Sequence, residues 1–142
     1  MNVLIDTCIW SLALRRMEPR KSTEISELSR LVTGGNAMLL GAVRQEILSG
    51  VREKSQFERL KDALSAFPDI MLATDDYVTA ALFFNLCRRH GIQGANTDFL
   101  LCAVAVRHDI PIFTTDRDFP LFARHLPIVL HKYADSPMTD KG

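Results

Sequence analysis

Four acidic residues stand where a parallel sheet would gather their side chains. Asp6 and Asp116 each follow a short apolar run that is typical of a buried strand. Glu46 lies a little over one turn into a helix that follows another such run, and Asp98 lies in the first turn of an apolar helix. Because parallel strands align their C-terminal ends, these side chains can converge although they are distant in sequence. Asp118, two residues after Asp116, is a fifth candidate.

Converged carboxylates favour a bound cation, because they repel one another and at least one of them would otherwise hold a proton. Oxygen ligands without cysteine or histidine suit Mg²⁺ or Mn²⁺, which keep several water molecules of their own. In phosphodiester hydrolysis such ions orient and deprotonate a water molecule, neutralise the scissile phosphate and stabilise the leaving oxygen. The acids therefore point to metal-assisted phosphodiester chemistry.

Each acid also has an ordinary explanation when it is considered alone. Asp6 could cap the helix that follows it, and Glu46 could belong to the solvated face of an amphipathic helix. Asp98 could be a first-turn acid favoured by the helix dipole. Asp116 and Asp118 could be turn residues that cap the next helix. Their shared position at strand ends favours one common site over separate explanations.

Strands alternate with helices along the whole chain, which predicts one α/β domain with a central parallel sheet flanked by helices. Apolar runs predict strands at 2–5, 37–40, 112–114 and 128–130, with a short edge element at 70–72. The spacing of apolar residues predicts helices at 22–33, 41–50, 53–66, 74–90, 98–108 and 121–123.

Length and composition fit one soluble globular domain. The chain has 142 residues, 47% of them hydrophobic and 24% charged, with a formal net charge of zero. This length is enough to bury a single core. The overall basic character of many nucleic-acid-binding proteins is missing, although acids elsewhere could offset a local basic patch. No segment approaches eighteen uninterrupted apolar residues, so we expect no membrane span.

The cysteines and histidines point away from disulfides and from a histidine-ligated metal. Cys8, Cys87 and Cys102 are widely spaced and form no CxxC pair, which predicts reduced thiols and a cytoplasmic location. The four histidines show neither HxH nor HExxH spacing. Any metal site is therefore expected to use carboxylates.

Four short motifs occur in an order that is typical of one nuclease family. They are Val3-Leu4-Ile5-Asp6-Thr7 with Trp10, Val43-x-x-Glu46-Ile47-Leu48-x-Gly50, Asn96-x-Asp98-x-Leu100-Leu101-x-Ala103-x-Ala105, and Thr114-x-Asp116-x-Asp118-Phe119. Through these motifs the sequence resembles PIN-domain ribonucleases, and more narrowly the VapC toxins of bacterial toxin–antitoxin pairs. The resemblance extends from Asn2 to about Leu130. Each motif alone is weak, but four in order are strong.

The resemblance implies a PIN-like, Rossmann-like three-layer fold over residues 1–133, followed by a polar tail at 134–142. It implies an Mg²⁺- or Mn²⁺-dependent endoribonuclease that acts on structured RNA, either tRNA or rRNA. The implied catalytic residues are Asp6, Glu46, Asp98, Asp116 and Thr114, where Thr114 would orient the acids or a water molecule. The implied metal ligands are Asp6, Asp98 and Asp116, with Asp118 as a possible addition. The resemblance further implies a homodimer and a VapB-like antitoxin that covers the active groove.

Several other interpretations compete with this one. A haloacid-dehalogenase-type phosphatase needs a second acid at the position of Cys8, and a dinucleotide-binding domain needs a GxGxxG motif that the chain lacks. A catalytically silent PIN module that binds RNA or protein is the main alternative, and the intact set of acids argues against it. Candidate phosphate contacts are Arg15, Arg16, Arg44 and Arg117, although surface solvation would explain each of them as well.

Overall fold

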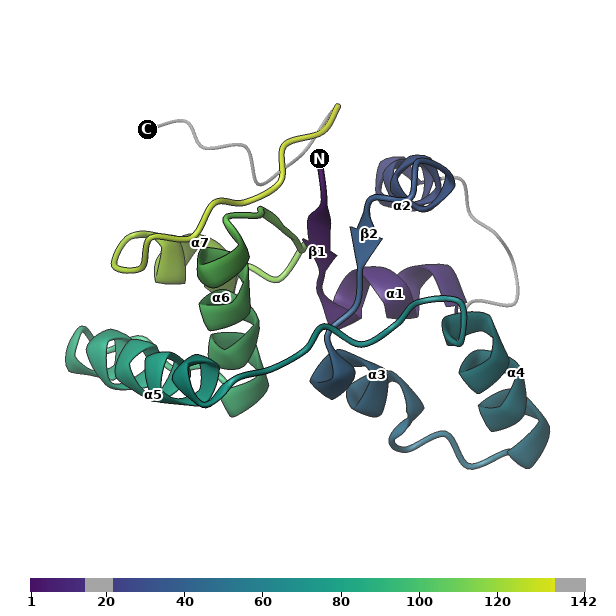
Figure 1. Cartoon of the computed structure of the whole chain (residues 1–142), viewed down its shortest axis with the longest axis horizontal. Coiled ribbons are helices and arrows are strands. Elements are labelled where there is room, and N and C mark those ends of the chain that lie inside the picture. The colour runs from purple at the N-terminus through teal and green to yellow at the C-terminus, as the bar shows by residue number, and fades with distance from the viewer. Residues whose placement is uncertain (15–21, 135–142) are drawn as a thin grey trace.

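Three short parallel strands form the centre of the structure (Figure 1). The computed structural model describes residues 1–14 and 22–134. The strands are β1 (Val3–Ile5), β2 (Ala37–Met38) and β3 (Ile112–Phe113), in the order β2-β1-β3. Leu4 is paired with Met38 on one side and with Ile112 on the other. The continuous apolar run of β1 is buried along its whole length, as expected for a central parallel strand.

The prediction of two strands is wrong, because each of these segments forms only a single isolated β-bridge. The segment 128–130 pairs with β3 only through Leu130 and Ile112, where Ile112 donates to the Val129 carbonyl and accepts from His131. The expected edge element at 70–72 is replaced by a bridge between Leu39 and Asp69. Ile70 and Ile128 are buried, but Met71 and Val129 are largely exposed, and neither segment has a full row of backbone partners.

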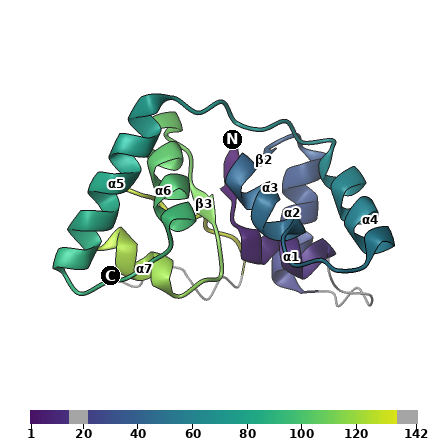
Figure 2. The same ribbon diagram turned by 90° about the horizontal axis from the view of Figure 1, so that it is seen from below.

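The helices agree with the predicted alternation and surround the sheet. They are α1 (Thr7–Leu14), α2 (Thr23–Thr33), α3 (Gly41–Leu48), α4 (Lys54–Leu64), α5 (Thr74–Arg89), α6 (Asn96–His108) and α7 (Asp118–Ala123). Figures 1 and 2 place α5, α6 and α7 on one side of β1, and α1 to α4 on the other. The predicted α/β architecture, a parallel sheet flanked by helices, is confirmed. No helix in the described ranges is long and apolar enough to cross a membrane.

Helix α6 is the most deeply buried helix and carries one of the predicted acids. Phe99, Leu101, Cys102 and Val104 are almost fully buried on it, and α5 packs along it. The turn before α6 needs a glycine, because a Cβ atom on Gly94 would lie 2.6 Å from Phe122 Cζ. The chain before α6 can therefore pass close to Phe122 only without a side chain at this position. In the first turn of α6, Thr97 and Asp98 share a cavity with Asp6 and Asp116, which follow β1 and β3.

The ends of the predicted domain lie partly outside the described residues. Of the predicted polar tail at 134–142, residues 135–142 lie outside the described ranges. The candidate phosphate contacts Arg15 and Arg16 also lie outside them. The domain boundary at 133 therefore stays a prediction.

Candidate active site

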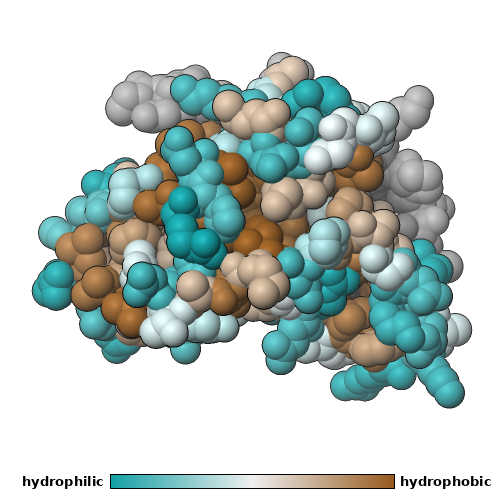
Figure 3. Space-filling view, in the orientation of Figure 1, coloured by the Kyte–Doolittle hydropathy of each residue, from teal (hydrophilic) through white to brown (hydrophobic). Residues whose placement is uncertain are grey.

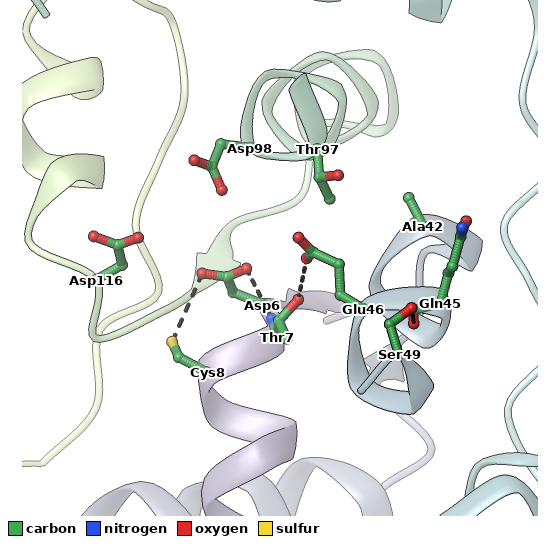
Figure 4. A pocket seen from close by; sticks show the side chains of 10 residues that line it. All are labelled: Asp6, Thr7, Cys8, Ala42, Gln45, Glu46, Ser49, Thr97, Asp98 and Asp116. Atoms are coloured by element: carbon green, nitrogen blue, oxygen red, sulfur yellow. Dashed lines mark hydrogen bonds between the residues drawn. The ribbon is translucent and has the colours of Figure 1, made fainter. Parts of the chain in front are cut away.

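A cavity of about 590 Å³ opens at the C-terminal ends of the strands (Figure 4). Its lining residues come from the ends of β1 and β3, from α1 and α3, and from the first turn of α6. They are Asp6, Thr7, Cys8, Ala42, Gln45, Glu46, Ser49, Thr97, Asp98 and Asp116. The structure thus brings together the four acids that the sequence placed at strand ends.

Asp6 is the most buried of the four acids, with 6% of its surface exposed. Its Oδ1 accepts the backbone N–H of Thr7 at 2.8 Å, and its Oδ2 accepts the hydroxyl of Thr114 at 2.8 Å. The thiol of Cys8 lies 3.7 Å from the same Oδ2. Three groups from two elements therefore hold this carboxylate in one orientation.

Thr114 connects Asp6 with Asp116. Its side chain is buried, with 3% of the residue exposed. The hydroxyl donates to Asp6 Oδ2 and accepts the backbone N–H of Asp116 at 3.0 Å. Both hydrogen-bonding functions of one hydroxyl are used, which couples the end of β1 to the segment after β3.

Glu46 reaches the cavity from α3. Its Oε1 accepts the hydroxyl of Thr7 at 2.7 Å, which joins α3 to the first residue of α1 (Figure 4). Glu46 is exposed, as expected for a residue on the solvated face of an amphipathic helix. Its carboxylate nevertheless lines the same cavity as Asp6 and Asp98.

Asp98 combines a helix-terminal role with a place in the cavity. Its Oδ2 accepts the backbone N–H of Ala95 at 3.0 Å, as a first-turn acid would. Burial is the main reason that the pKa of Asp98 is raised to about 6, and the charges of Asp6, Asp116 and Glu46 raise it further. The hydrogen bond from Ala95 opposes this rise.

Asp116 likewise has two roles. Its Oδ1 accepts the backbone N–H of Asp118 at 2.9 Å, and its carbonyl accepts the N–H of Phe119, so it organises the start of α7. This contact explains why α7 begins at Asp118 rather than at the predicted Leu121. Asp118 itself is exposed and is not among the residues that line the cavity. Its place as a metal ligand stays a prediction.

The electrostatics of the cavity fit a bound cation. Burial raises the pKa of Asp6, and the charge of Asp116 adds to that rise, although hydrogen bonds from Thr114 and Thr7 oppose it. Four carboxylates line this cavity, and no lysine or arginine is among its described lining residues. A divalent cation would relieve their repulsion, and hard oxygen ligands of this kind suit Mg²⁺ or Mn²⁺.

The acids do not form a closed metal cage. Within residues 1–14 and 22–134, no three acidic, histidine or cysteine side chains come close enough together to hold one ion by themselves. Mg²⁺ commonly uses only one or two carboxylates and completes its octahedron with water and substrate phosphate. The open arrangement therefore fits an ion that is shared with water and substrate.

Two of the basic candidates can be placed. The guanidinium of Arg44 donates to Asp69 Oδ1 at 2.9 Å, to the Leu64 carbonyl at 2.9 Å and to the Phe67 carbonyl. These contacts tie α3 to the end of α4, and Arg44 does not line the cavity. Arg117 is exposed beside Asp116. For both arginines, a contact with RNA phosphate stays a prediction.

Sequence reasoning missed the neutral residues of the cavity. Cys8 was expected to be an ordinary reduced thiol, and Gln45, Ser49 and Thr97 were not singled out. One signal could have found part of this set, since Ala42, Gln45, Glu46 and Ser49 have the i, i+3, i+4, i+7 spacing of one helix face.

Comparison with known proteins identifies the family. The family model described as the PIN domain matches residues 3–125. The match covers most of the chain, and this protein belongs to the PIN domain family.

Curated relatives resemble the chain over most of their length. VapC ribonuclease Mb1587 from Mycobacterium bovis is 29% identical over 125 residues, which cover 86% of this chain and 92% of that protein. Ribonuclease VapC11 from Mycobacterium tuberculosis gives the same figures. The predicted likeness to VapC proteins is confirmed.

Solved structures share the fold. FitAcB from Neisseria gonorrhoeae superposes with a TM-score of 0.73 at 17% identity, covering 92% of this chain and 96% of that one. VapBC2 from Rickettsia felis, bound to a DNA fragment from its promoter, gives a TM-score of 0.71 at 18% identity, covering 92% and 98%. At this level of identity the two structures confirm the PIN fold alone.

Proposed function

We propose that this protein is an Mg²⁺- or Mn²⁺-dependent endoribonuclease that hydrolyses phosphodiester bonds of structured RNA, either tRNA or rRNA, as the toxin of a toxin–antitoxin pair. One observation carries the proposal: carboxylates from four separate segments share one cavity, where burial and the charges of the other three raise the pKa of Asp98. The names of the VapC ribonucleases that the chain resembles support RNA as the substrate.

Asp6, Asp98 and Asp116 would hold the cation together with water and substrate oxygens, because no three acids are close enough to hold it alone among the described residues. Glu46 would complete the acidic pocket, and Asp118 stays a further candidate ligand. A bound Mg²⁺ or Mn²⁺ supplies the charge that activates a water molecule and neutralises the scissile phosphate. Thr114 orients Asp6 through its hydroxyl, and Thr7 does the same for Glu46. These bonds fix ligand oxygens before substrate arrives, so less reorganisation is needed during the reaction.

RNA contacts outside the acidic cavity would come from basic residues near its rim. Arg117 is exposed next to Asp116, and it is our main candidate. Arg15 and Arg16 remain proposed from the sequence alone. Arg44 also remains a candidate, although its hydrogen bonds to Asp69 and to two carbonyls favour a role in holding α3 in place.

Purified full-length chain, freed of any bound partner, provides the test. With tRNA and rRNA as substrates, we expect cleavage with Mg²⁺ or Mn²⁺, none with EDTA, and none with Asp116→Asn. Asn at 116 keeps the oxygen that accepts the Asp118 N–H, so α7 should still form. Sequencing the new RNA ends identifies the target. A folded wild-type chain that binds RNA but cuts none with either ion would instead support the catalytically silent module.

We also propose a protein partner, a VapB-like antitoxin that covers the active groove. The support is that structural neighbours such as VapBC2 and the Klebsiella pneumoniae complex are toxin–antitoxin assemblies. A segment that covers this cavity would need cationic side chains to offset the carboxylates. A cytoplasmic location stays a prediction, which rests on the free thiols of Cys8, Cys87 and Cys102.

A homodimer is the last part of the proposal. Tyr77, Val78 and Leu82 on α5 are large apolar side chains that are more than half exposed. Figure 3 shows apolar side chains gathered at the surface over this helix. A second copy of the chain that packs on this face would remove them from water.

A further inference from the structure

The cavity has two chemically different walls (Figure 4). Asp6, Asp98 and Asp116 form an acidic wall at the ends of β1 and β3 and at the start of α6. The wall formed by α3 is neutral apart from Glu46, and it presents Gln45 together with two small residues. Glu46 lies at the boundary between the walls, where it accepts the Thr7 hydroxyl.

The amphipathic pattern of α3 explains why Gln45 belongs to the cavity. Val43 and Ile47 are fully buried on the core face of α3. Gln45 and Glu46 lie on the opposite face, within the i, i+3, i+4, i+7 series that begins at Ala42. The core contacts of Val43 and Ile47 therefore leave Gln45 on the face of α3 that lines the cavity.

The Gln45 amide has unused hydrogen-bonding capacity. The neighbouring Ser49 hydroxyl is already bonded to the Gln45 carbonyl at 2.7 Å. For the Gln45 side chain, by contrast, no hydrogen bond is found within the part of the chain that the structure describes, and the residue is exposed to the cavity. A carboxamide offers two donors and one acceptor in a plane.

This chemistry suits a nucleobase better than a phosphate. A neutral amide adds no charge to bind a phosphate, whereas it pairs side by side with a base edge that carries one donor and one acceptor, as adenine does at N6 and N7. Sequence-specific RNA recognition uses unstacked bases whose edges are open to such side chains. With the scissile phosphate at the acidic wall, a flanking base would reach the α3 wall.

We propose that Gln45 is a specificity-determining residue, which pairs with the edge of an unstacked base next to the scissile phosphate and so selects the cleavage site. The inference rests on the proposed ribonuclease function and adds to it the feature of the RNA that is read.

The test uses purified full-length chain, Mn²⁺ and an RNA pool with a randomised loop, and it sequences the newly formed ends. We expect wild type to prefer one base at a fixed position beside the cut. In Gln45→Ala this preference should fall by about tenfold, as expected for the loss of one paired contact, while cleavage continues. In Gln45→Glu the preference at that position should move towards cytosine, since a carboxylate accepts from the cytosine N4 amino group. Gln93→Ala is the matched control, because it removes an exposed glutamine outside this cavity.

The possible outcomes distinguish the proposed ribonuclease function from the proposed role of Gln45. If wild type cuts no RNA, the proposed function fails and this inference fails with it. If wild type cuts with a base preference that Gln45→Ala and Gln93→Ala both retain, the function stands and Gln45 is only a solvated surface residue. If Gln45→Ala keeps its melting temperature but cuts nothing, Gln45 serves turnover rather than base choice, and the inference is overturned.

Discussion

Single side chains at the strand ends hold the acids in place, and Thr114 is the most constrained of them. Its hydroxyl is buried and serves Asp6 and the backbone of Asp116 at once. Removing it would leave the partly buried Asp116 N–H without its partner and Asp6 Oδ2 with only the Cys8 thiol at 3.7 Å.

Thr114→Val should therefore destabilise the protein by about 1–3 kcal/mol, the typical cost of unsatisfied buried polar groups. It should also raise the pKa of Asp6 further, because the Thr114 hydrogen bond lowers that pKa in the wild type. Urea unfolding measures the first effect and the pH dependence of RNA cleavage the second. Thr114→Ser is the control and should behave like wild type. Equal stability of the Val and Ser variants would contradict this role.

Asp98 makes stability depend on pH. Its folded pKa of about 6 lies above the ordinary value of 3.8, so the folded state holds the proton more tightly than the unfolded state. Its contribution to stability is complete below pH 3.8 and is lost as the pH rises to about 6. Without added metal, wild type should lose stability relative to Asp98→Asn across this range.

Urea unfolding of both proteins in EDTA, from pH 4 to pH 7, checks this expectation. The difference between the two curves is the relevant quantity, because Glu27 and Asp76 have lowered pKa values and act in the opposite direction in both proteins. A constant difference across the range would show that Asp98 does not titrate as described.

For single residues, the sequence predicted the acidic side chains that line the cavity but not the neutral ones. Asp6 and Asp116 could be found because an acid after a buried apolar run is a recognisable pattern. Cys8 gave no such signal. Gln45 shares a helix face with Glu46, but this spacing alone does not distinguish a cavity lining from any solvent-exposed helix face.

At the scale of elements, an ion pair fixes α5 against α6. Arg107 donates to Asp76 through Nε at 2.6 Å and through Nη2 at 2.8 Å, and it also donates to the Met71 carbonyl. Asp76 is buried and accepts the Ala73 N–H as well. The pair connects the start of α5 with the end of α6, the helix that carries Asp98.

Arg107→Ala should lower the free energy of unfolding by about 2 kcal/mol, because it leaves a buried carboxylate with only one backbone partner. Chemical denaturation measures the loss. Lys61→Ala is the matched control, since it breaks the exposed pair with Glu58 and should change the free energy of unfolding far less than Arg107→Ala does. Similar losses in the two variants would argue against the Asp76 contact as a structural clamp.

The elements themselves were largely predictable, and the failures have one cause. Helices such as α2 and α5 follow from apolar spacing within their own sequence. A strand such as 128–130 also requires a neighbour with matching backbone groups, and only Ile112 provides one. Apolar periodicity reports burial, whereas strand pairing depends on contacts between distant segments.

At the scale of the whole molecule, the exposed apolar face of α5 predicts self-association. Leu82→Glu should convert the proposed dimer into a folded monomer, because a carboxylate would be buried in the interface without a partner. Sedimentation velocity measures the mass. Val129→Glu is the control, since Leu82 and Val129 are both 62% exposed but Val129 lies beside β3, where its carbonyl accepts the Ile112 N–H. The same mass for Leu82→Glu and wild type would exclude this face as the dimer interface.

The metal dependence of the site is tested directly by the rate of RNA cleavage as a function of Mn²⁺ concentration, measured for wild type, Asp98→Asn and Asp118→Asn. We predict saturable activation of wild type and a loss of more than about a hundredfold in Asp98→Asn, beyond what outer-shell changes usually cost a metal site. Asp118→Asn tests the remaining candidate ligand: because Asp118 is exposed and outside the cavity lining, a rate within a few-fold of wild type would remove it from the ligand set. Cleavage that is independent of Mn²⁺, or equal in wild type and Asp98→Asn, would contradict a metal-dependent site built from these carboxylates.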